Sequence, residues 1–394
     1  MNDNDQKFIW GVTNIGTQTE GNDQYGNWTR WARRGLVPTI GVANAYTHQY
    51  QKDHDLVKEL GCNGMRLTIE WSRIEPEEGI FDQDAIMHYK KVLYDLKRRK
   101  IKTIVGLWHW NIPMWCEEKY GMHDQKIVHK FETFVEHVCE NLGHLVDCIV
   151  VLNEPTVYVR SSYLAGSRPP FVISYTKAYY VARNLIAMHK SVYKLWKDKY
   201  PNIWIGSTYL WNDERGAQNT FFQRIYLWVK TYFSVTYFIH ALLPYGDFIG
   251  VNYYTSDRFF FGRSGKKWGV HGTNDWHDPD VWRVFPDGLY HVLMQAKKYH
   301  KPIMILENGK PTNSGLHDKD RQEFLAQSIL YMHKAIADGA DVRGYFHYCL
   351  CDSYEWDSGY DFKFGLVEID RTTGNRARRD SFFVYKKIIA GARK

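Results

Sequence analysis

The amino-acid sequence predicts one domain of the α/β class, a single (β/α)8 TIM barrel that spans residues 1–394. Eight short apolar runs rich in β-branched residues alternate with eight longer segments of helical periodicity, as expected for a chain of βα units. No Ser/Gly-rich linker and no short internal repeat interrupts this alternation, and one barrel domain often reaches this length.

The expected elements follow one another in strict alternation. The strands are Phe8–Thr13, Gly64–Ile69, Thr103–Trp108, Cys148–Leu152, Trp204–Thr208, Phe248–Asn252, Ile303–Leu306 and Gly344–Leu350. The helices are Thr47–Leu60, Gln83–Arg99, Lys126–Asn141, Ser174–Lys199, Thr220–Leu243, Pro286–Tyr299, Asp318–Asp338 and Asp380–Ala390. The second helix has the clearest pattern, because apolar side chains recur every three or four residues along one face.

An open, doubly wound parallel sheet is the alternative arrangement of such units. That fold would place a Gly-rich nucleotide-binding loop directly after the first strand, and Gly11, Gly16 and Gly21 lack the required spacing. A closed barrel also makes a functional prediction, because its active groups lie at the carboxyl ends of the strands.

Composition and charge argue against several classes of partner. Hydrophobic residues make up 44% of the chain, which is enough for a large core, and the net charge of +7 is small for this length. No long basic run is present, so nucleic acid is not expected as a partner. The six cysteines form neither a disulfide framework nor a metal-ligand spacing, and we expect no metal and no cofactor.

The chain shows neither a targeting segment nor a membrane span. Its first residues, Met1–Asp5, are polar and acidic, unlike a signal peptide. The most apolar helical stretch, Phe221–Leu243, contains Arg224, Lys230 and His240 and reads as an amphipathic helix. We therefore expect a cytoplasmic protein without an integral membrane segment; its oligomeric state is left open.

Two glutamates directly follow apolar strands. Glu154 comes after the fourth strand and Glu307 after the seventh, so a barrel would bring both side chains to one mouth. A facing pair of carboxyl groups is what glycoside hydrolysis needs. A separation of about 5 Å gives retention of configuration and one of about 6.5–9.5 Å gives inversion, and the sequence does not decide between them.

A series of motifs runs along nearly the whole chain. They are Phe8-Ile9-Trp10-Gly11, Gln18-Thr19-Glu20-Gly21, Arg66 to Ile74, Trp108-His109-Trp110, Asn153-Glu154-Pro155, Gly250 to Tyr254, Glu307-Asn308-Gly309 and Asp352 to Tyr360. In their kind and order, these motifs resemble glycoside hydrolase family 1, the β-glucosidase-type (β/α)8 barrels. Details such as Ile69–Trp71 and Trp108–Trp110 favour its archaeal branch.

The resemblance implies a retaining exo-β-glycosidase that hydrolyses small β-glucosides or oligosaccharides, with side activity on β-galactosides and β-fucosides. It assigns the acid/base to Glu154 and the nucleophile to Glu307 of a double displacement. It places Arg66, Asn252 and Tyr254 around the nucleophile, where a cation and a hydroxyl would favour the charged carboxylate. The sugar-binding positions that it implies are Gln18, His109, Asn153, Tyr348, Glu355 and Trp356, with Trp282 as a wall on the aglycone side.

The chain also departs from the family pattern. Tyr348 stands where the family usually has the Trp beneath the sugar, and Ser353 replaces a common Asn. The segment between Tyr209 and Phe248 is short and rich in aromatic residues. We favour the interpretation that it forms an outer helix packed on the barrel; the alternative is an apolar approach for alkyl or aryl aglycones.

Two other functions are alternatives on the same fold. A sugar-binding barrel without activity would be expected to lack one of the two carboxylates, and both are present. An enzyme that mainly transfers glycosyl groups to alcohols would have the same site, and only its products would distinguish it.

Overall fold

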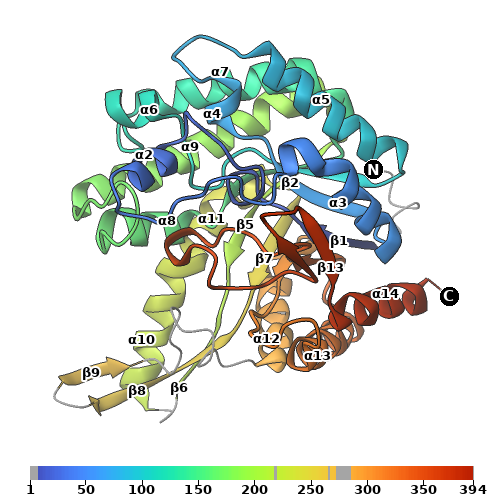
Figure 1. Cartoon of the computed structure of the whole chain (residues 1–394). Coiled ribbons are helices and arrows are strands. Elements are labelled where there is room, and N and C mark those ends of the chain that lie inside the picture. Colours follow the sequence, from blue (N-terminus) through green and yellow to red (C-terminus); the bar gives the residue numbers. More distant parts are fainter. Residues whose placement is uncertain (1–7, 217–219, 265–266, 272–284, 394) are drawn as a thin grey trace.

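A closed barrel of eight parallel strands forms the centre of the molecule in the computed structural model, which describes residues 8–216, 220–264, 267–271 and 285–393 (Figure 1). The order of the strands around the barrel is β1-β11-β10-β7-β5-β4-β3-β2. All eight expected strands are confirmed. Their bounds are β1 Ile9–Thr13, β2 Gly64–Thr68, β3 Lys102–Gly106, β4 Cys148–Asn153, β5 Trp204–Leu210, β7 Phe248–Tyr253, β10 Ile303–Asn308 and β11 Val342–Tyr348.

The expected helices surround the barrel, and each follows its strand. In α5 the Asp82 side chain accepts hydrogen bonds from the first-turn amides of Asp84 and Ala85, while the apolar face turns inward. The main covering helices are α3 Tyr46–Leu60, α5 Gln83–Arg98, α7 Lys126–Leu142, α9 Tyr175–Lys199, α12 Pro286–Ala296, α13 Lys319–Ala337 and α14 Asp380–Ala392. Short helices that follow strands are α1 Gly16–Thr19, α4 Trp71–Ile74, α6 Met114–Lys119 and α8 Pro155–Tyr158, and α2 Asn27–Arg33 lies in the first loop.

The core has two parts. The larger part lies between the strands and the helices, and a smaller cluster of eight buried side chains comes from strands β1, β3, β4, β7, β10 and β11. Gly11 on β1 has no room for a side chain, since a Cβ there would lie 2.3 Å from the Phe346 ring. The interior is therefore filled at this level, and only the carboxyl ends of the strands can hold a ligand.

Two small sheets were not predicted. The strands β12 Val367–Asp370 and β13 Asn375–Arg378 form a hairpin before α14. The strands β6 Asp213–Gly216, β8 Ser256–Ser264 and β9 Lys267–His271 form a second sheet, which extends away from the barrel beside α10 Phe221–Thr231 (Figure 1).

The aromatic segment between Tyr209 and Phe248 only partly follows the favoured interpretation. A helix forms, and it continues from α10 through a wide turn, η4 Tyr232–Thr236, into α11 Tyr237–Leu242. Phe238 and Ile239 of α11 are buried against the barrel, as expected. The prediction is wrong for α10, because Phe222 and Trp228 are exposed.

None of the helices in the described ranges combines the length and the apolar character that crossing a bilayer requires.

Candidate active site

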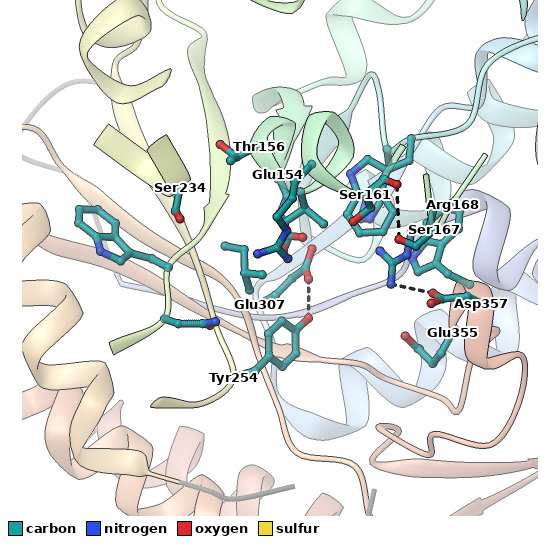
Figure 2. Close-up of a pocket in the computed structure, with 18 of the residues that line it drawn as sticks. Glu154, Thr156, Ser161, Ser167, Arg168, Ser234, Tyr254, Glu307, Glu355 and Asp357 are labelled. Carbon is teal, nitrogen blue, oxygen red and sulfur yellow. Dashed lines mark hydrogen bonds and ion pairs between the residues drawn. The ribbon is translucent and has the colours of Figure 1, made fainter. Parts of the chain in front are cut away.

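The two glutamates lie at one end of the barrel, as the strand positions predict. Glu154 directly follows β4 and Glu307 lies near the end of β10. Both line a pocket with a cavity volume of about 400 Å³, which they enter from two strands that are separated in the barrel by β5 and β7 (Figure 2). The fold therefore brings together two residues that are 153 positions apart in the sequence.

The Glu307 carboxylate is held by a cation and a hydroxyl. Arg66 Nη1 donates to Glu307 Oε1 at 2.5 Å, and Tyr254 Oη donates to Oε2 at 2.5 Å. Burial and the charge of Glu307 raise the pKa of Tyr254 well above its ordinary value, so Tyr254 stays a donor. Both oxygens of the Glu307 carboxyl group are therefore held by donors, which fixes the orientation of this group.

Glu154 has a different environment. Burial raises the pKa of its carboxyl to about 8, and the negative charge of Glu307 adds to this effect. Its nearest partner is an amide, since Asn252 Nδ2 donates to Glu154 Oε1 at 2.7 Å. Glu154 also has left-handed backbone with φ 44°, an unfavourable conformation that the turn between β4 and Pro155 imposes. Burial and the charge of Glu307 therefore favour the protonated form of Glu154, which is the form that a general acid requires.

Asn153 connects the residues around the two glutamates to His109. Its Oδ1 accepts from Arg66 Nη2 at 2.6 Å, from Thr208 Oγ1 at 2.6 Å and from Asn252 Nδ2 at 3.3 Å. Its Nδ2 lies 3.0 Å from His109 Nε2. These contacts fix the orientation of the amide, and the network assigns the hydrogen of the His109 ring to Nδ1.

His109 is a neutral donor that faces the pocket. Burial and the nearby Arg66 charge lower its pKa well below the ordinary value. Within the described ranges, His109 Nδ1 and Gln18 Oε1 are buried polar atoms without a hydrogen-bond partner, and both residues line the pocket. Buried polar groups are normally paired, so one free donor and one free acceptor here fit hydroxyl groups of a ligand.

Glu355 forms the centre of a second network on the floor of the pocket. Tyr348 Oη lies 2.9 and 3.1 Å from its two carboxyl oxygens, and Ser353 Oγ donates to Oε1 at 2.7 Å. Gln18 Nε2 donates to Tyr348 Oη at 2.8 Å and to Glu355 Oε2 at 3.2 Å. Burial raises the pKa of Glu355 to about 8 in spite of these donors. The two departures from the family pattern, Tyr348 and Ser353, thus both contact the same carboxyl group.

Aromatic side chains close the pocket beside His109. The Trp356 ring stacks on His109 with centroids 5.6 Å apart and lies 5.0 Å from the Trp110 ring. The Arg168 guanidinium lies 5.0 Å from the Trp110 ring centroid and pairs with Asp357 at 2.7 Å (Figure 2). Trp110 lines the pocket, and Trp282, the expected wall on the aglycone side, lies outside the described residues.

Several site residues were missed by sequence reasoning. Thr208 could have been found, because it lies near the carboxyl end of β5, at the same mouth as the other strand-end residues. The ion pairs Arg168–Asp357 and Lys230–Glu214 at the pocket rim had no sequence signal, since their partners come from separate loops and helices. In the described part of the chain no group of three His, Cys, Asp or Glu residues could hold a metal ion.

Comparison with known proteins agrees with this geometry. The model of glycosyl hydrolase family 1 matches residues 3–242 and 239–393. A β-galactosidase of Pyrococcus woesei is 28% identical over 98% of this chain and 96% of its own length, and β-glucosidase A of Acetivibrio thermocellus is 27% identical over 97% of each. A solved β-glycosidase structure from Pyrococcus horikoshii has 33% identity and a TM-score of 0.90, over 98% of this chain and 94% of its own.

Proposed function

Since the chain belongs to glycosyl hydrolase family 1 and is a retaining β-glycosidase, we propose that it releases the terminal sugar from small β-glucosides and short oligosaccharides. β-Galactosides and β-fucosides are secondary substrates in this proposal. The observation that carries it is the unequal pair of carboxyl groups, Glu307 bound by Arg66 and Tyr254, and Glu154 with a pKa of about 8. The names of relatives, which include both β-glucosidase and β-galactosidase, support this substrate range.

In the first step, Glu307 attacks the anomeric carbon and Glu154 donates its proton to the departing glycosidic oxygen. The C1–O bond to the aglycone breaks as the bond to Glu307 forms, so the aglycone leaves as a neutral alcohol. Arg66 and Tyr254 hold the attacking carboxylate in place from both oxygens. A covalent α-glycosyl–Glu307 ester results.

In the second step, water replaces Glu307 at the same carbon. Esterification removes the negative charge of Glu307, which is one cause of the high pKa of Glu154. The pKa of Glu154 therefore falls in the intermediate, and the residue can accept a proton from the attacking water. The product has the β configuration of the substrate.

Gln18, His109, Asn153, Glu355 and Trp356 bind the non-reducing sugar in this proposal. His109 Nδ1 offers a hydrogen to a hydroxyl group, and Gln18 Oε1 accepts one. Tyr348 replaces the larger indole of the family, so its ring contributes less contact area to the sugar and its hydroxyl serves Glu355 instead.

Azide rescue tests the two roles separately. We expect Glu154→Ala to lose at least about a hundredfold in kcat on a β-glucoside with a poor leaving group, because general acid catalysis contributes about 10²–10⁴-fold. With an activated aryl β-glucoside, azide should restore turnover and give the β-glucosyl azide, because azide attacks the glycosyl enzyme.

Glu307→Gly supplies the matched second half of the experiment. Hydrolysis of the aryl β-glucoside should be abolished, and azide in the vacated position should attack the anomeric carbon from the α face, displace the aryl group and give the α-glucosyl azide, the opposite anomer to the Glu154→Ala product. Recovery of the α-azide from Glu154→Ala, or near-normal turnover by Glu307→Gly, would contradict the assignment.

A further inference from the structure

The helix α10 has its apolar face on the outside. Phe222 is 75% exposed and Trp228 69% exposed, although both are large aromatic side chains. The inward side of the helix is polar, since Gln223 is buried and Lys230 pairs with Glu214. A surface helix of a globular protein normally has the opposite arrangement, so this face is built to meet something other than water. The exposed apolar residues recur at helical spacing: Phe221, Phe222, Ile225, Trp228, Val229 and Phe233.

The exposed face continues onto the start of α9. Tyr175, Tyr179 and Tyr180 are exposed there, and so is Ile173 just before the helix. Tyr237 lies between the two parts, because it begins α11, which contacts α9 and continues from α10 through η4. We call the exposed apolar side chains of residues 221–233 and of residues 173–180 the aromatic face.

In the described part of the chain, the charged side chains of the segments that form the aromatic face are all cations. Residues 155–197 and 220–246 contain no aspartate and no glutamate. Arg183 and Arg224 are exposed, and Lys177 is half-buried. Within the described ranges these three cations make no ion pair with a carboxylate. The Arg183 guanidinium lies 5.7 Å from the Tyr179 ring centroid, so cation and aromatic ring are interleaved.

We propose that the aromatic face docks on an anionic lipid bilayer. Exposed Trp, Tyr and Phe beside Lys and Arg are the combination that binds the headgroup region of such a surface. A second copy of the chain is a poorer occupant, because two faces with cations and no carboxylates would repel each other. Figure 1 shows α10 projecting from the barrel together with β8 and β9.

Docking would place the mouth of the pocket near the bilayer. The inner side of the same helical segment lines that mouth with Lys230, Thr231, Ser234 and Val235. The docking itself does not depend on the glycosidase chemistry, because none of the residues of the aromatic face lies among the carboxyl groups and their partners.

Vesicle sedimentation tests the proposal with the full chain. We expect the protein to sediment with vesicles of equal parts phosphatidylcholine and phosphatidylserine, at least about tenfold more tightly than with phosphatidylcholine alone. The double variant F222S/W228S should lose at least about tenfold in this partitioning. The variant K177E/R183E should lose the preference for anionic vesicles, and added salt should weaken binding of the unmodified protein.

Two controls make the result decisive. Tyr94→Ser on α5 and Leu330→Ser on α13 remove apolar side chains of similar exposure, 62% and 66%, from elsewhere on the barrel and should leave binding unchanged. Hydrolysis of a soluble aryl β-glucoside should be unaffected by F222S/W228S, which shows that the variant is folded. Equal binding by F222S/W228S and the unmodified chain, or no binding to anionic vesicles, would overturn the proposal. Concentration-dependent dimers that F222S/W228S abolishes, without vesicle binding, would assign the face to a second copy instead.

Discussion

The protonation of a single residue, Glu154, controls the pH range in which the proposed reaction can run. Its pKa is raised to about 8, chiefly by burial and then by the charge of Glu307. The acid is present below that pH and is lost as pH rises through it. We expect kcat/KM for an aryl β-glucoside to fall about tenfold per pH unit above about pH 8.

Glu154→Gln is the matched variant for this pH profile. It keeps the shape of the side chain but cannot titrate, so with an activated leaving group its alkaline limb should disappear. An unchanged limb in Glu154→Gln would assign the ionisation to another group, and Glu355, whose pKa is also raised to about 8, would be the next to test.

The hydroxyl group of Tyr348 is a second single-residue feature of the site that can be tested. It contacts both oxygens of Glu355 and accepts from Gln18, so Tyr348→Phe removes a donor from a buried carboxyl group. A hydrogen bond contributes about 0.5–1.5 kcal/mol, which predicts a rise in KM for the β-glucoside of about two- to tenfold with a smaller change in kcat. Steady-state kinetics on the two proteins measure this split.

Ser353→Ala is the companion variant, because Ser353 donates to Oε1 of the same carboxyl group. It should raise KM in the same direction and, combined with Tyr348→Phe, less than additively, since the two donors share Glu355. A loss confined to kcat in both variants would mean that Tyr348 and Ser353 do not act through sugar binding.

At the scale of elements, the loop after β11 is tied to the start of α14 by a buried ion pair. Arg379 is fully buried and forms a two-pronged contact with Asp352, at 2.8 Å from Nη2 to Oδ2 and 3.0 Å from Nη1 to Oδ1. The same loop carries Ser353, Glu355 and Trp356 to the pocket. The pair therefore connects the stability of an outer helix to the floor of the site.

Removing one partner should be costly. Arg379→Ala leaves Asp352 buried without its counter-ion, and we expect a loss of about 3–5 kcal/mol in the free energy of unfolding, measured by urea denaturation. The neighbouring Arg378 pairs with Glu59 at the surface, so Arg378→Ala should cost at most about 1 kcal/mol. Equal losses in the two variants would show that burial of the Arg379 pair has no special effect.

Elements also differ in how far their sequence patterns decided them. Each barrel strand is buried on both faces and is therefore a short, nearly continuous apolar run that can be recognised in the sequence. The expected and observed bounds of these strands differ by a few residues at most. The helix α10 shows the limit of such patterns. Its aromatic stripe predicts a helix, but it does not say which side of the helix the protein covers, because that depends on the neighbouring Glu214 and β8.

For the whole molecule, the sequence determined the barrel, its family and the two strand-end glutamates. Local alternation of strand and helix fixes the parallel topology, and this topology alone brings Glu154 and Glu307 to one mouth. Tertiary structure decided what depends on contacts between distant segments. The protonation of Glu154 arises from burial and from a charge 153 residues away, and the Glu355 network joins Gln18 to residues more than 300 positions later. The outward direction of the apolar side of α10 was also decided by tertiary structure, since the exposure of a side chain depends on packing rather than on any local pattern.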